Sequence, residues 1–167
     1  MGSPGRPESH LSASALREAL DWARVHLRSV GAAWDETLSL VNGTDFQALS
    51  SREDLRKLRR AVRRWHDLTL EPVVRLAPVV ERWGSMPLSE DGEPYLARVL
   101  VGMDLNEFNG MCDGMDAELE SALHAGLPLA RLDWRDRLVE LMEIGVRTCA
   151  ATIEWAEGTV RAAGAAA

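Results

Sequence analysis

Apolar residues recur along the chain at alternating steps of three and four positions, which keeps one side of an α-helix apolar. The clearest run spans about eight helical turns and predicts a helix that begins at Ser12 or Ser14 and ends at Val41. A stripe of that length needs several partner helices to cover it, so the pattern predicts a bundle. Its apolar positions are Leu16, Leu20, Ala23, Leu27, Val30, Trp34, Leu38 and Val41.

The second stripe predicts a helix that opens with a capping box, Ser50-x-x-Glu53, whose hydroxyl and carboxylate bond free amides. Gly84 marks its end. Pro72 and Pro78 fall inside it, and each lacks the amide that would bond to the preceding turn. We therefore expect a kink near Pro72 or a short break over residues 70–72. The apolar positions are Leu55, Leu58, Val62, Trp65, Val73, Leu76, Val80 and Trp83.

Two more stripes predict a helix that begins at Pro94 and another that runs from about Ala130 to Arg161. Gly126-Leu-Pro128 separates them, because glycine permits the left-handed turn and proline prevents continuation. Apolar positions of the third helix are Val101, Leu105, Phe108, Cys112, Met115, Leu119 and Ala122. Those of the fourth are Leu132, Val139, Met142, Val146, Cys149, Ile153, Ala156 and Val160.

Short loops between long helices favour antiparallel neighbours, so the expected fold class is all-α, an up-down-up-down four-helix bundle. The chain has 167 residues, of which 46% are hydrophobic, enough for one sizeable core. We expect a single domain over residues 12–161, with disordered tails at 1–11 and 162–167.

The overall charge bears on partners and location. A net charge of −7 argues against general binding of nucleic acids or anionic membranes, which requires positive charge. We expect no signal peptide, because residues 1–12 lack an apolar core, and no apolar run in the sequence is long enough to span a bilayer. Two cysteines do not make a disulfide framework, which favours a reducing, cytoplasmic location. No cofactor motif is present.

Charged residues form blocks of opposite sign. Residues 52–64 hold seven basic side chains, and residues 90–120 hold nine acidic ones against Arg98 alone. An antiparallel pairing of these helices predicts that Arg60, Arg63 or Arg64 lies near Asp113, Asp116 or Glu118. The alternative is two separately solvated faces. The fourth helix carries an acidic strip, which is either solvated or meets a basic partner: Asp133/Asp136, Glu140/Glu143 and Glu154/Glu157.

The segment 102–116 conflicts with its own helical pattern, since each glycine inside a helix costs roughly 0.8–1 kcal/mol relative to alanine. Glycine allows close approach of another backbone, and methionine adapts to irregular shapes. The alternatives are tight packing against neighbouring helices or a break near Gly110. We predict a binding surface or cavity formed by Gly102, Met103, Asn106, Gly110, Met111, Gly114 and Met115.

Two further patterns suggest chemistry. The spacing of Arg60 and His66 resembles the Arg-x5-His motif of HEPN ribonucleases, also helical bundles. The resemblance implies His66 as the base and Arg60 as the group that holds the scissile phosphate. Alternatively, His26 and His66 lie level across the first hairpin and hold a metal, or they are rim histidines. Further ligands would come from Glu107, Glu143, Cys112 and Cys149.

These patterns favour a non-enzymatic binding protein. Its partner would be another protein, a second copy of the chain, or an apolar small molecule held between helices. The alternative is a helical-bundle enzyme centred on His66 with Arg60, or a metal site at His26 and His66. Cys112 and Cys149 lie on the apolar stripes, so we expect buried, slowly reacting thiols.

Overall fold

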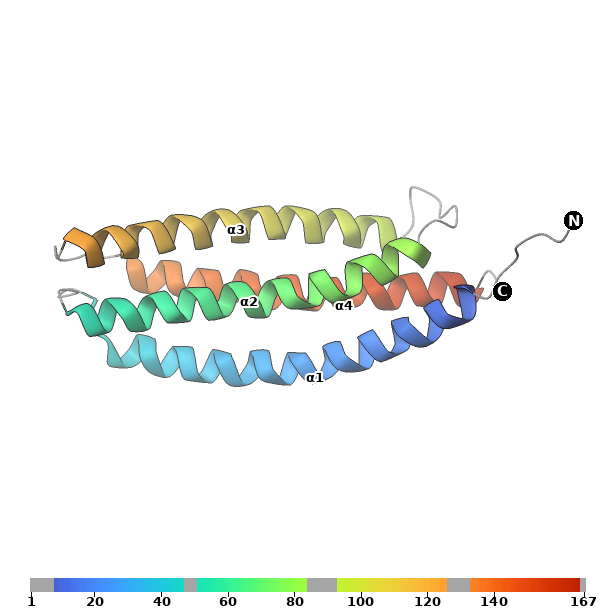
Figure 1. The fold of residues 1–167 in the computed structure, drawn as a ribbon, viewed down its shortest axis with the longest axis horizontal. Coiled ribbons are helices and arrows are strands. Elements are labelled where there is room, and N and C mark those ends of the chain that lie inside the picture. Colours follow the sequence, from blue (N-terminus) through green and yellow to red (C-terminus); the bar gives the residue numbers. More distant parts are fainter. Residues whose placement is uncertain (1–7, 47–50, 84–92, 126–132, 166–167) are drawn as a thin grey trace, which may run out of the picture.

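The computed structural model describes residues 8–46, 51–83, 93–125 and 133–165, which form four long helices and contain no strand. Figure 1 shows the helices side by side, with successive helices running in opposite directions. The predicted all-α four-helix fold is confirmed. The helices are α1 (Glu8–Gly43), α2 (Arg52–Trp83), α3 (Glu93–Ala125) and α4 (Trp134–Ala165).

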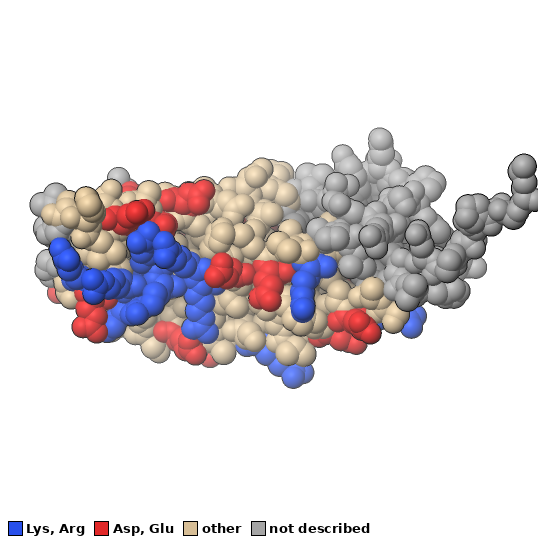
Figure 2. Space-filling model, in the orientation of Figure 1, with Lys and Arg blue, Asp and Glu red and all other residues tan. Residues whose placement is uncertain are grey.

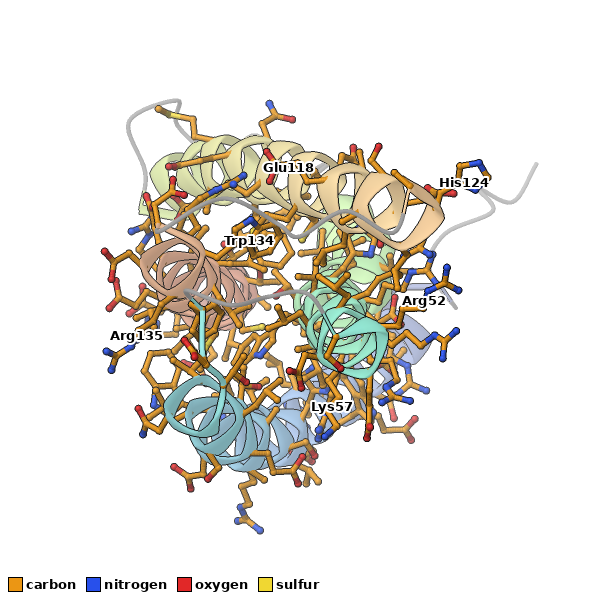
Figure 3. All side chains as sticks on the ribbon, turned by 90° about the vertical axis from the view of Figure 1, so that its left-hand side faces the viewer. Arg52, Lys57, Glu118, His124, Trp134 and Arg135 are labelled. Atoms are coloured by element: carbon orange, nitrogen blue, oxygen red, sulfur yellow. The ribbon has the colours of Figure 1, made fainter. Side chains whose placement is uncertain are left out.

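The four helices do not contribute equally to the core. α2 and α4 contact each other as well as both remaining helices, whereas α1 and α3 have no mutual contact within the described ranges. Viewed along the bundle, α2 and α4 lie between α3 on one side and α1 on the other (Figure 3). The outward faces of α2 and α4 therefore lie on opposite flanks of the molecule.

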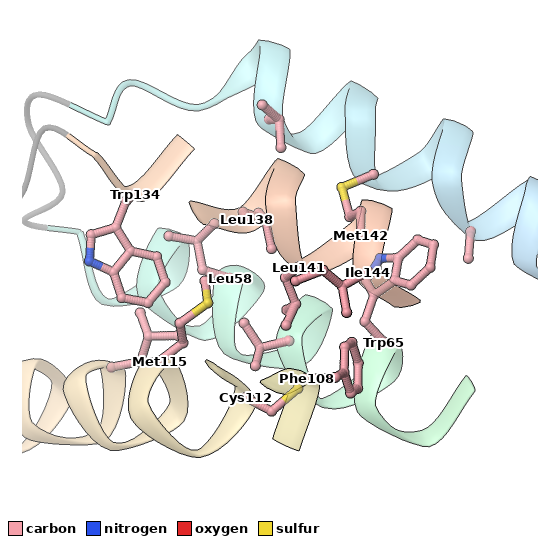
Figure 4. Close-up of a cluster of buried hydrophobic side chains, with 14 of the residues drawn as sticks. Leu58, Trp65, Phe108, Cys112, Met115, Trp134, Leu138, Leu141, Met142 and Ile144 are labelled. Atoms are coloured by element: carbon pink, nitrogen blue, oxygen red, sulfur yellow. The ribbon is translucent and has the colours of Figure 1, made fainter. Parts of the chain in front are cut away.

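The core along α2 and α3 follows the predicted stripes from Leu55 to Trp65 and from Phe108 to Ala122, whereas the predicted Val73 and Leu105 are only partly buried. Buried residues of α2 meet those of α3 and a third row from α4, as Figure 4 shows. Full burial of such a side chain contributes about 1.5–3 kcal/mol, so this layer supplies most of the driving force. The predicted residues that are buried here are Leu55, Leu58, Val62, Trp65, Phe108, Cys112, Met115, Leu119 and Ala122.

α1 departs from its predicted stripe. Leu27, Trp34 and Leu38 are only partly buried, whereas His26 and Thr37 lie inside. Thr37 is tolerated there because its Oγ1 donates to the Ala33 carbonyl at 2.7 Å and accepts from Trp65 Nε1 at 2.9 Å. A polar side chain that keeps its hydrogen bonds costs little to bury. A prediction based on apolar residues alone therefore missed these two core positions of α1.

Helix boundaries differ from the prediction by a few residues. α1 begins at Glu8, before Ser12, and α4 extends from Trp134 to Ala165. Ser51 occupies the N-cap position of α2, since its carbonyl accepts the amide of Leu55 at 3.1 Å. Ser50, the predicted cap, lies outside the described residues. Disorder of the two tails stays a prediction.

α2 and α3 each run without interruption through their unusual residues. α2 is helical through Pro72 and Pro78, so the alternative of a short break there is wrong, and the kink near Pro72 stays a prediction. α3 is helical through Gly110, so the predicted alternative of a break there is wrong. None of the helices in the described part of the chain has a stretch both long and apolar enough to span a bilayer.

Candidate functional site

The predicted 102–116 surface lies on α3 and divides into two parts. Gly102, Met103, Asn106, Gly110 and Gly114 face solvent, and 64% of Met103 is exposed. Met111 is partly buried against the core, and Met115 is fully buried. The structure therefore brings five of the seven predicted residues together on one exposed helix face and assigns the other two to packing.

The glycines of this face do not seat α3 against a neighbour. A Cβ atom added at Gly102, Gly110 or Gly114 would meet nothing within 4 Å. Tight helix packing, the alternative explanation, is therefore wrong for all three positions. Gly145 of α4 is instead a packing glycine, where an added Cβ would lie 2.9 Å from Thr69 Oγ1.

The exposed face continues beyond the predicted segment. Ala117 and Ser121 are exposed one and two turns after Gly114, which the helical period of 3.6 places on the same side. Sequence reasoning missed Ala117 and Ser121, although their helical spacing from Gly114 would have placed them on the same face. This uncharged row, the α3 outer line, consists of Met103, Asn106, Gly110, Gly114, Ala117 and Ser121.

Carboxylates border the α3 outer line on its α2 side. Arg59 Nε donates to Asp116 Oδ1 at 2.9 Å, and Arg63 Nε lies 3.3 Å from the same oxygen. The hydrogen bond from Arg59, which outweighs the opposing effect of burial, lowers the pKa of Asp116. The predicted contact between the basic and acidic blocks is confirmed by Arg63. Arg64 instead bonds Glu36 of α1.

A second acidic border faces α4. Arg147 binds both carboxylate oxygens of Asp104 at 3.0 and 3.2 Å, and Arg137 donates to Glu118 at 2.9 Å. These pairs fix the register of α3 against α4, because each charge on one helix meets its opposite on the other. The uncharged line thus runs between two rows of carboxylates that are largely occupied by arginines of neighbouring helices.

The pair proposed from the HEPN resemblance does not converge within the described contacts. Arg60 is exposed on the outer side of α2. His66 is half-buried, and its ring stacks on Phe108 of α3 with centroids 6.5 Å apart. Six residues of a helix turn through about 600°, so the two side chains leave α2 roughly 120° apart. No hydrogen bond or ion pair joins them among the described residues.

His26 is buried, so its assignment to the rim is wrong. Its Nε2 lies 2.8 Å from the Leu68 carbonyl of α2, and Cys149 Sγ of α4 approaches the same oxygen at 3.6 Å. The Leu68 carbonyl would normally accept the amide of residue 72, but Pro72 has none. His26 and Cys149 supply the missing donors, which joins α1, α2 and α4 at one atom.

The metal hypothesis requires three or more ligating side chains close together. Among residues 8–46, 51–83, 93–125 and 133–165, no three His, Cys, Asp or Glu side chains form such a group. His26 faces Leu68 and stacks on Trp22, whereas His66 faces Phe108. The two histidines therefore have separate surroundings.

Both cysteines are buried and unpaired with each other, as their stripe positions predicted. Burial raises the pKa of the Cys112 and Cys149 thiols to about 12, which leaves about one thiolate in ten thousand at pH 8. We expect a thiol reagent to label the native protein at least about 100-fold more slowly than the urea-unfolded protein. Native labelling should accelerate as the pH rises. Equal rates in the two states would contradict this.

The main feature of the α3 surface is therefore its exposed, uncharged outer line. Comparisons with models of known protein families, with curated protein sequences and with solved structures give no match.

Proposed function

We propose that the protein is a non-enzymatic binding module whose α3 outer line docks a helix of a partner protein. The observation that carries this proposal is the composition of that line. It is solvent-facing but uncharged for five turns, and its glycines have open space above them. The outer row of a helix that only meets water usually carries charged residues.

The physical argument concerns the cost of Gly110 and Gly114. Each costs roughly 0.8–1 kcal/mol relative to alanine in an exposed helix, and no contact within the described residues offsets this. A partner helix would, because a surface without Cβ atoms lets two helix backbones approach closely. Met103 at one end adds an adaptable apolar contact.

Charge defines the partner further. Asp113 is exposed beside the outer line and has no ion-pair partner among the described residues, and every charged residue of α3 between Gly102 and Ser121 is acidic. A complementary helix would present small or apolar residues centrally and Lys or Arg at its edges. The free thiols of Cys112 and Cys149 support a cytoplasmic location for this interaction.

Site-specific photocrosslinking in the cells that produce the protein tests the proposal. A photoreactive amino acid in place of Asn106 should give a discrete crosslinked protein, which mass spectrometry identifies. The same group at Arg28, exposed on α1, serves as the matched control and should not give that adduct. Combining the Asn106 probe with Gly110→Arg and Gly114→Arg should abolish it, because both arginines would block close approach.

The fold should survive the arginine substitutions, since both glycines have open space around them. Circular dichroism checks this. The absence of any adduct from the Asn106 position, or equal adducts from Asn106 and Arg28, would contradict the proposed function. An adduct with twice the mass of the chain would identify the partner as a second copy.

A further inference from the structure

The outward faces of α2 and α4 carry charges of opposite sign in the same order. On α2, the exposed residues Arg56, Arg60, Arg63 and Asp67 follow one another at steps of four, three and four. Such steps place them in one row along the helix. Figure 2 shows basic side chains gathered over the first half of α2 and acidic ones beyond them.

α4 repeats this spacing with every sign reversed. Its exposed residues Asp136, Glu140, Glu143 and Arg147 also follow one another at steps of four, three and four. Each differs from its α2 counterpart by 80 in residue number, so one offset relates all four pairs. Asp136, Glu140 and Glu143 of the acidic strip thus complement Arg56, Arg60 and Arg63 of the basic block.

The two rows lie at the same height in the bundle. Leu68 of α2 is level with Cys149 of α4, as the 3.6 Å contact of the thiol with the carbonyl shows. That pair differs by 81 in residue number, almost the offset that relates the two rows. α2 and α4 also run in the same direction (Figure 1). A sideways shift of one copy, without rotation, therefore brings its α4 row opposite the α2 row of the next.

The central charges are available for such contact. Arg56, Arg60, Asp136 and Glu140 have no ion-pair partner among the described residues. Neighbouring arginines four residues apart on one helix repel each other, and none of the ion pairs within residues 8–46, 51–83, 93–125 and 133–165 involves Arg56 or Arg60. Arg63 already binds Asp116 and would gain Glu143 of the next copy as a second partner. Arg147 already binds Asp104 and would gain Asp67 of the next copy.

We propose that copies of this chain associate side by side, the α2 row of one against the α4 row of the next. Because the two rows lie on opposite flanks, each contact joins two different surfaces and is therefore heterologous. Copies related by a shift without rotation cannot form a closed ring, so the contact generates an open row of molecules. Exposed ion pairs are individually weak, so the association is weak and salt-dependent. It does not depend on the α3 outer line.

Analytical ultracentrifugation tests the proposal. In about 0.1 M NaCl, where the Debye length is about 10 Å, the repulsion between chains of net charge −7 is screened but contact pairs persist. The weight-average sedimentation coefficient should rise with protein concentration there. At about 1 M NaCl, where the Debye length is about 3 Å, the rise should disappear.

Charge reversal identifies the surfaces. Arg56→Glu with Arg60→Glu, and separately Asp136→Arg with Glu140→Arg, should each weaken association at least about tenfold, because attraction becomes repulsion. An equimolar mixture of the two variants should associate again, since the reversed α2 row of one then faces the reversed α4 row of the other. Arg17→Glu with Arg28→Glu on α1 is the control, which changes the net charge by the same amount as Arg56→Glu with Arg60→Glu and should retain association.

Three outcomes would overturn this inference. They are a wild-type protein that stays monomeric at every concentration in 0.1 M NaCl, equal losses in the α1 control, and a mixture that does not associate. Association that survives both reversals but is lost on Gly110→Arg with Gly114→Arg would assign self-association to α3 instead. The crosslinking experiment at Asn106 is unaffected by any of these results, so the two proposals fail separately.

Discussion

Replacing Gly145 with valine should destabilise the protein by about 1–3 kcal/mol, because overpacking a close-packed interior forces strain on its neighbours. A Cβ at this position would lie 2.9 Å from Thr69 Oγ1, 3.1 Å from the Trp65 ring and 3.3 Å from the Phe108 ring. The two rings are buried and cannot move aside cheaply. Urea unfolding monitored by circular dichroism measures the loss.

Exposed glycines of α3 provide the matched control. Gly110→Ala and Gly114→Ala should each raise the free energy of unfolding by about 0.8–1 kcal/mol, since they add helix propensity in open space. A gain at Gly145, or losses at Gly110 and Gly114, would contradict the opposite roles assigned to these glycines. If a partner helix docks on the α3 outer line as proposed, its binding should weaken in the same two variants, because the added Cβ atoms hinder close approach.

Thr69 allows the close approach at Gly145 to be examined separately. Its Oγ1 is buried and finds no hydrogen-bond partner in the described part of the chain, so Thr69→Ala removes an unsatisfied polar atom at little cost. The same substitution opens space beside Gly145. Gly145→Ala should therefore be better tolerated together with Thr69→Ala than alone, as a double-mutant cycle would show.

The apolar pattern predicted most of the fold because hydrophobic burial dominates the energetics of a bundle. The α3 stripe from Phe108 to Ala122 is buried as expected, since its steps of three and four are never interrupted by a polar residue. α1 was predicted less well. Its core-facing row passes through His26 and Thr37, whose burial depends on partners in α2 that no local pattern reveals.

The glycines show the same limit for the candidate site. Gly110, Gly114 and Gly145 all lie inside helices, and the sequence drew attention only to the first two. What distinguishes Gly145 is its contact with Thr69 and Trp65, which are more than 75 residues away along the chain. The opposite charge rows of α2 and α4 were visible as separate blocks. Their common height in the bundle required the structure.

Pro72 and His26 should be energetically coupled, because both act on the Leu68 carbonyl. His26→Phe keeps the ring that stacks on Trp22 at 4.9 Å but removes the donor 2.8 Å from Leu68. Leaving a buried carbonyl without its main donor should cost about 1–3 kcal/mol. Cys149 offsets little of this, since a thiol is a weak donor at 3.6 Å.

In the Pro72→Ala background the same His26→Phe change should cost less, because the restored amide of residue 72 then donates to Leu68 within α2. Urea unfolding of the four proteins in this cycle should give a coupling energy of about 0.5–3 kcal/mol. Additive effects, to within about 0.5 kcal/mol, would mean that His26 does not stabilise the bundle through the Leu68 carbonyl. A positive coupling would identify the proline as the reason that a histidine is buried between α1 and α2.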